Sequence, residues 1–131
     1  MAAVLPRPIA RLAPLMDMHV EVVPPSGAGV ITLRGEIDVH TAPLLRQRIV
    51  DLVDDGVRAI VVDMASVDFV DSTGIGVLTE ASKRATAHGA TLSLVLTRDP
   101  ILKILQMSAP GETLPIYRSR DEALQASPPP D

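Results

Sequence analysis

Two short runs of aliphatic residues, at positions 57–64 and 91–96, do most to limit what this chain can fold into. Each run is almost continuously apolar, rich in β-branched or branched side chains and short, which is typical of a strand buried on both faces. A helical pattern of apolar residues separates them, at Ile75, Leu78, Ala81 and Ala85, and Gly89 supplies a stop. Strands joined through a helix are parallel, with a right-handed crossover. The sequence therefore predicts an α/β domain.

The other segments extend this pattern into a small mixed sheet covered by helices. Residues 15–23 and 30–35 are predicted strands, and the proline- and glycine-rich turn between them makes an antiparallel hairpin. Thr41 is expected to cap a helix that ends at Gly56. Three elements follow later: a helix with Asp99 as cap and Pro100 in its first position, an edge strand at 113–117 that contains Pro115, and a short helix opened by the capping box of Ser119 and Glu122. The expected sheet has four to five strands, covered by about four helices.

Composition limits both the domain organisation and the function. A chain of 131 residues is one domain, expected at 15–126, between a tail at 1–14 and a proline-rich tail at 127–131. One Tyr, one Phe, no Trp and a net charge of −4 argue against nucleic-acid binding, which uses basic surfaces and aromatic stacking. The absence of cysteine excludes disulfides and thiolate metal sites. The apolar runs are too short to cross a membrane, so we expect a cytoplasmic protein with no membrane partner.

The segment Asp71-Ser72-Thr73-Gly74 carries the main functional signal, because it places hydroxyl groups where the helix after the 57–64 strand begins. Either Asp71 or Ser72 can cap this helix by accepting from its free N–H groups. A phosphate on Ser72 would lie at the positive end of the helix dipole, which suits a phosphorylation switch. The residues alone favour an ordinary helix cap with no regulatory role, because Asp, Ser and Thr are common at helix starts.

Other motifs in this segment are weaker. Asp-Ser-Thr-Gly resembles the Asp-Thr-Gly loop of aspartic proteases, but such a protease needs a second loop of this kind, which only a second copy of the chain could supply. Gly74 and Gly76 fall inside the expected helix, and the third glycine of a dinucleotide-binding motif is missing. We therefore expect no catalytic residues, no cofactor and no metal site.

Two longer motifs carry a family resemblance. Residues 33–38, Leu-Arg-Gly-Glu-Ile-Asp, and residues 67–76, Val-Asp-Phe-Val-Asp-Ser-Thr-Gly-Ile-Gly, resemble motifs of the STAS family. Within that family the chain is most similar to the bacterial anti-sigma factor antagonists. The resemblance runs from about residue 15 to residue 124 with the element order intact, and implies an α/β STAS-like fold and a binding protein that is not an enzyme.

The resemblance also implies partner switching. In this family the unphosphorylated antagonist binds an anti-sigma factor, which is also a serine kinase, and so releases a sigma factor. Phosphorylation of the serine that matches Ser72 ends this binding, and a metal-dependent serine phosphatase restores it. The expected partner-binding residues are Asp38, Asp71, Thr73, Gly74 and Ile75.

Some alternatives stay open. Asp38 could serve only as a turn carboxylate, and Thr73 is the second candidate for phosphorylation. The whole protein could instead be a stand-alone scaffold, or a regulatory subunit of a stress-signalling or transporter complex. A small enzyme or a nucleotide-binding protein is the remaining class.

Overall fold

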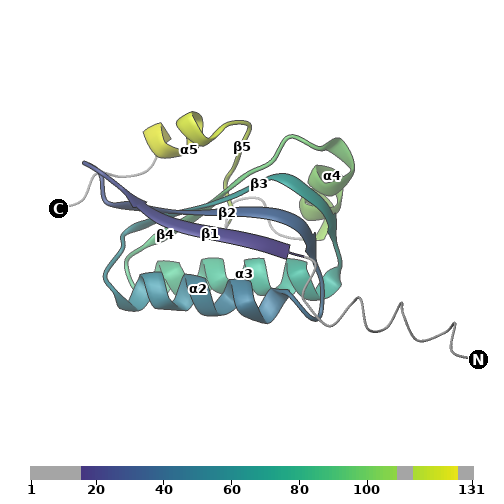
Figure 1. Cartoon of the computed structure of the whole chain (residues 1–131), viewed down its shortest axis with the longest axis horizontal. Helices are drawn as coiled ribbons and strands as arrows, with labels where there is room; N and C mark the ends of the chain where they lie inside the picture. The colour runs from purple at the N-terminus through teal and green to yellow at the C-terminus, as the bar shows by residue number, and fades with distance from the viewer. Residues whose placement is uncertain (1–15, 109–113, 127–131) are drawn as a thin grey trace, which may run out of the picture.

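The centre of the molecule is a five-stranded sheet whose strands lie in chain order, β1-β2-β3-β4-β5 (Figure 1). The structure, a computed structural model, describes residues 16–108 and 114–126. The strands are β1 Met16–Val23, β2 Ala28–Ile37, β3 Ala59–Val70, β4 Thr91–Val95 and β5 Ile116–Tyr117. The helices in these ranges are α2 Ala42–Asp54, α3 Ser72–Ala87, α4 Asp99–Ser108 and α5 Arg120–Ala126. The predicted architecture is confirmed, and the tails predicted at 1–14 and 127–131 lie outside the described residues.

The strand directions agree with the prediction. β1 and β2 form the antiparallel hairpin, and each later neighbouring pair of strands is parallel. The strand predicted at 57–64 pairs with the one predicted at 91–96 over Ala59–Asp63. Because α2 and α3 each connect parallel neighbours, both helices begin at the carboxyl edge of the sheet. The loops that precede them therefore lie side by side at this edge.

Helices cover both faces of the sheet. α2 and α3 lie side by side under one face, α5 lies over the other, and α4 lies at one end (Figure 1). The larger core fills the space between the sheet and the α2–α3 layer, with Ile31, Leu33, Leu45, Ile49, Ile60, Val62 and Leu78 among its buried members. A smaller core under α5 contains Val30, Val61, Val95 and Ala123. Consecutive residues of one strand thus enter opposite cores, which is why the strands read as continuous apolar runs.

Strand β3 continues to Val70, whereas the sequence predicted a strand that ends at Met64. The register against β2 shifts twice along this extension. At the first shift, the Asp63 carboxylate accepts a hydrogen bond from the Ala65 N–H at 3.0 Å. Each irregularity changes the alternation of the strand, so that Val67 and Val70 return to the large core despite exposed residues between them. A search for strictly alternating apolar and polar residues could therefore not predict this part of the strand.

The expected capping role of Thr41 is wrong. Thr41 occupies the N-cap position of α2, but its side chain makes no capping hydrogen bond. The Thr41 hydroxyl instead donates to the Glu36 carbonyl at 2.8 Å and accepts from the Asp38 N–H at 2.9 Å. It therefore closes the turn between β2 and α2.

The later elements differ from prediction in small ways. Helix α4 begins at Asp99 itself, so this residue lies inside the first turn and does not precede it. The Ser119 hydroxyl accepts from the Glu122 N–H at 3.1 Å, as predicted, whereas the Glu122 carboxylate accepts from the Arg118 N–H at 3.0 Å. β5 lies at the edge of the sheet, as Pro115 predicted, but is shorter than expected.

Candidate functional site

Ser72 is the first residue of α3 and is exposed. Asp71 takes the N-cap position with extended backbone, and its Oδ1 accepts from the Gly74 N–H at 2.9 Å. Of the two residues that could cap this helix, Asp71 does so. The Ser72 hydroxyl therefore has no capping duty, and no residue within the described ranges accepts from it or donates to it. It is a free hydroxyl group at a helix N-terminus.

Gly74 brings the start of α3 against the end of β2. A Cβ atom on Gly74 would lie 2.7 Å from Cγ2 of Ile37 and 3.1 Å from the Ile37 carbonyl oxygen. The Asp71 N–H donates to this same carbonyl at 3.1 Å. Gly74 thus lets the helix start approach the neighbouring strand closely, while a Cβ atom on Gly76 would meet no described atom within 4 Å, its own stretch of helix aside. The segment that carries Ser72 is therefore attached to the residue before Asp38.

Asp38 shapes the turn between β2 and α2. Its Oδ1 accepts from the N–H groups of His40 and Thr41, at 2.8 and 3.1 Å, and lies 3.3 Å from the Thr41 hydroxyl oxygen. Partial burial acts to raise the pKa of the Asp38 carboxyl, but the hydrogen bonds and the nearby His40 ring together lower that pKa from its ordinary value of 3.8. Asp38 is therefore a carboxylate at neutral pH, with the turn role that the sequence allowed.

The five residues predicted to bind a partner differ in accessibility. Thr73 is exposed, and Asp38 and Asp71 are half-buried. Gly74 is buried, and Ile75 is 9% exposed and belongs to the large core. The sequence motifs bring all five to the carboxyl edge of the sheet, and their role in binding stays a prediction.

Sequence reasoning missed two exposed apolar residues at this edge. Val39, in the turn before α2, is 58% exposed, and Leu44, in the first turn of α2, is 43% exposed. An apolar side chain between the polar turn residues Asp38 and His40 was the available signal. Exposed apolar groups next to polar ones are typical of protein-binding surfaces. The Ser72 surface, as we call it, consists of Asp38, Val39, Leu44, Ser72 and Thr73.

An open groove runs along α3 from the Ser72 surface. It has a volume of about 500 Å³ and is lined by Ser72, Ile75, Gly76, Thr79, Glu80 and Lys83. Gly76 lacks a side chain and so leaves room in the groove. Glu80 is tied to α2 by an ion pair, in which Nε of Arg46 lies 2.9 Å from Oε1 of Glu80. The groove extends the accessible surface beside Ser72 by several turns of helix.

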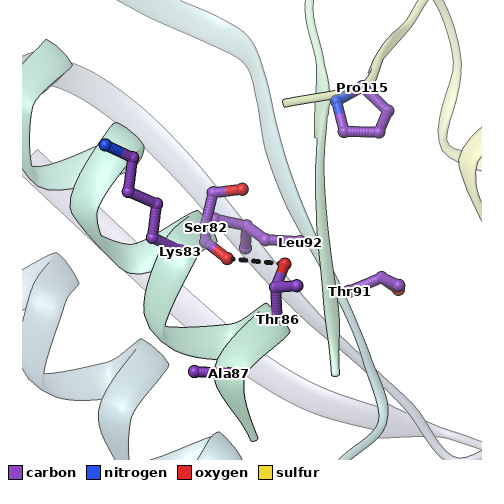
Figure 2. A pocket seen from close by; sticks show the side chains of 7 residues that line it. All are labelled: Ser82, Lys83, Thr86, Ala87, Thr91, Leu92 and Pro115. Atoms are coloured by element: carbon purple, nitrogen blue, oxygen red, sulfur yellow. Dashed lines mark hydrogen bonds between the residues drawn. The ribbon is translucent and has the colours of Figure 1, made fainter. Parts of the chain in front are cut away.

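A second hollow lies at the other end of α3, between its last turns, β4 and Pro115 (Figure 2). Its volume is about 490 Å³, and its described lining residues are Ser82, Lys83, Thr86, Ala87, Thr91, Leu92 and Pro115. Figure 2 shows the Thr86 hydroxyl bonded to the Ser82 carbonyl, at 3.0 Å. Among these lining residues only Lys83 is titratable. The described lining residues therefore offer no acid–base pair, and Lys83 is shared with the groove that contains Ser72.

In residues 16–108 and 114–126, no group of three or more His, Asp or Glu side chains could hold a metal ion. In the same ranges, no helix is both long enough and apolar enough to span a lipid bilayer.

Family models, similar sequences and solved structures all relate this chain to one protein family. The STAS domain family model matches residues 19–123. The anti-sigma F factor antagonist of Paenibacillus polymyxa is 26% identical over 114 residues, which cover 83% of this chain and 94% of that protein. An anti-sigma factor antagonist from Mycobacterium paratuberculosis has a crystal structure with a TM-score of 0.77 and 29% identity, covering 88% of this chain and 97% of that one.

A further solved structure, the Bacillus cell fate determinant SpoIIAA in the phosphorylated form, has a TM-score of 0.65 and 24% identity, and covers 83% of this chain and 97% of that one. At this identity the likeness concerns the fold. Since the family model spans most of the sequence, and the solved structures share the fold, the chain belongs to the STAS domain family.

Proposed function

We propose that the protein is an anti-sigma factor antagonist, and that phosphorylation of Ser72 switches off its binding to an anti-sigma factor. The observation that carries the proposal is the free, exposed Ser72 hydroxyl at the start of α3, beside a cap that Asp71 already provides. The names of similar proteins as anti-sigma factor antagonists support the same function.

The local geometry allows a phosphate without a change of fold. Ser72 is exposed, so a phosphoryl group needs no space inside the core. The N-terminus of α3 favours negative charge through its unpaired N–H groups and its dipole. The Asp71–Gly74 hydrogen bond does not use Ser72, so the helix start keeps its cap after modification. Similar folds are known in a phosphorylated form, as in the Bacillus protein SpoIIAA.

Charge then provides the switch. A phosphate adds about −1.5 to −2 charges at neutral pH. It would lie beside the Asp71 carboxylate and close to the β2–α2 turn, which holds the carboxylate of Asp38. A partner surface that accepts a neutral hydroxyl would have to desolvate or oppose this charge. Such mismatches cost several kcal/mol, on the order of a thousandfold in affinity.

The Ser72 surface offers the rest of the binding energy. Val39 and Leu44 provide exposed apolar contacts, and Thr73 provides a second hydroxyl. The groove along α3 can receive side chains of the partner. In this scheme the anti-sigma factor is also the serine kinase, a metal-dependent serine phosphatase restores Ser72, and the antagonist has no catalytic turnover of its own.

Three variants test the proposal. Ser72→Ala should bind the cognate anti-sigma factor and resist phosphorylation, and Thr73→Ala should still be phosphorylated. Ser72→Asp should fold normally, because a carboxylate is favourable at a helix N-terminus, but should bind the partner much more weakly. The measurements are mass spectrometry of kinase-treated protein and binding of each variant. A phosphate found on Thr73, or wild-type binding by Ser72→Asp, would refute the proposed switch.

A further inference from the structure

Within residues 16–108 and 114–126, nothing pairs with the outer edge of strand β1, which has the features of a strand that pairs with another chain. Among the described residues β1 pairs only with β2, so one row of its backbone N–H and C=O groups faces outward. Its eight residues contain no proline and no lysine, and its register against β2 is continuous. Proteins usually protect an edge strand with such residues or with bulges. Val22, which is 55% exposed, adds an unprotected apolar side chain.

The two faces of β1 differ in chemistry. Met18 and Val20 are partly buried against the large core, on the side of α2 and α3. His19 and Glu21 project to the opposite face, where their side chains are 72% and 45% exposed. On that face Oε1 of Glu21 lies 3.8 Å from Nε2 of His19 and 3.8 Å from Nη1 of Arg120. The strand thus presents an apolar row on one face and polar, titratable side chains on the other.

A second copy can pair with this edge through a two-fold axis perpendicular to the sheet. Such an axis rotates the second copy within the plane of the sheet, so the corresponding faces of both copies lie on the same side. Residues on the same face of the two strands therefore lie opposite each other. If the axis passes through Val20, this residue lies opposite its own equivalent. Met18 then lies opposite Val22 of the second copy, and His19 lies opposite Glu21 of the second copy. The exposed apolar residue is covered, and an imidazole ring faces a carboxylate on both sides of the axis.

Neighbouring registers are poorer. An axis through His19 would place Asp17 opposite Glu21 of the second copy, and the two His19 rings opposite each other. An axis through Glu21 would place two carboxylates in contact. Like charges directly opposite each other destabilise an antiparallel pair. An axis through Met18 would also place His19 opposite a carboxylate, that of Asp17, but would leave Val22 without an opposite residue on the strand. The covering of Val22 and the facing of His19 by Glu21 together favour the register centred on Val20.

We propose that β1 is a self-association edge, which joins two copies of the chain into a continuous antiparallel sheet centred on Val20. The N-terminal segment of the same chain is a less suitable occupant, because Pro6, Pro8 and Pro14 lack the N–H groups that a paired strand donates. The proposal does not depend on Ser72, since none of the residues of the Ser72 surface lies on β1.

Cysteine cross-linking tests the register, because the chain contains no cysteine of its own. Directly opposite Cα atoms in an antiparallel pair are about 4.5–5.5 Å apart, within the range that a disulfide spans. Val20→Cys should therefore form a covalent dimer under mild oxidation. Val22→Cys is the matched control and should not, because position 22 faces Met18. Cross-linking of Val22→Cys or His19→Cys at the same rate, or failure of Val20→Cys, would overturn the proposal.

Sedimentation equilibrium of the full chain tests the energetics. His19→Glu should weaken self-association by about tenfold or more, since two like-charged pairs replace two favourable ones. The double variant His19→Glu/Glu21→Lys should restore self-association. Ile104→Lys changes an exposed apolar residue on α4 and should leave it unchanged. A wild-type chain that remains monomeric at about 1 mM, or a double variant no stronger than His19→Glu, would refute the pairing.

Discussion

Substitution of Gly74 by alanine should destabilise the protein and disturb the Ser72 segment. The added Cβ would lie 2.7 Å from Cγ2 of Ile37 and 3.0 Å from Cγ1 of Val70, so α3 and β2 must separate by roughly 0.7 Å to reach an ordinary contact. Overpacking of this kind costs about 1–3 kcal/mol, and the higher helix propensity of alanine returns up to about 1 kcal/mol. We expect a net loss of roughly 1–2 kcal/mol and a fall in Tm of roughly 4–8 °C.

Gly76 in the same helix provides the matched control. It is exposed, and a Cβ atom there would meet nothing within 4 Å among the described residues outside its own stretch of helix. Gly76→Ala should therefore stabilise the protein by about 0.5–1 kcal/mol, through helix propensity alone. Urea unfolding and thermal melts show whether each variant is less or more stable than the wild type. If Gly74→Ala were as stable as Gly76→Ala, the tight contact between α3 and β2 would be refuted.

Three further predictions concern the surroundings of the site. Asp71→Ala removes the cap of α3 and should lower the free energy of unfolding by about 1 kcal/mol, while Asp71→Asn should lose less, as urea titrations will show. The pKa of Asp38 is lowered in the folded state, so its charge-dependent stabilisation is full above its ordinary value of 3.8 and disappears as the pH falls through the lower folded value. Asp38→Asn, which keeps an acceptor, should thus be less stable than the wild type at neutral pH and match it in strong acid; a constant difference would contradict this. Arg120 donates to Thr32 at 2.8 Å and to Asp63 at 3.1 Å. Arg120→Ala should therefore accelerate amide exchange in α5 and leave α3 unchanged, and equal acceleration in both helices would count against this local role.

Most of the fold could be predicted because local and tertiary preferences agree in this chain. The runs at 57–64 and 91–96 are strands in both the pattern and the structure, and the helical spacing of Ile75 and Leu78 matches their buried positions in α3. The second half of β3 could not be predicted. Its register shifts break the alternation, and exposed Asp68 and Phe69 resemble a loop. Pairing with β2, a tertiary feature, decides that segment.

The place of the candidate site in the fold was predictable, whereas its local hydrogen bonding was not. The motifs placed Asp38 and Ser72 together, and the bond from the Asp71 N–H to the Ile37 carbonyl joins the two loops. Spacing alone could not tell whether Asp71 or Ser72 caps α3, because both side chains can accept at a helix start. Side-chain direction in the first helical turn depends on how α3 meets the sheet.

The most direct test compares the affinity of two forms of the chain for the cognate anti-sigma factor. One form is unmodified and the other carries a phosphate on Ser72, with its position verified by mass spectrometry and its fold by circular dichroism. Isothermal titration calorimetry should show a loss of affinity on the order of a thousandfold on phosphorylation, because a dianion replaces a neutral hydroxyl beside Asp71. Equal affinity of the two forms would contradict a switch at Ser72.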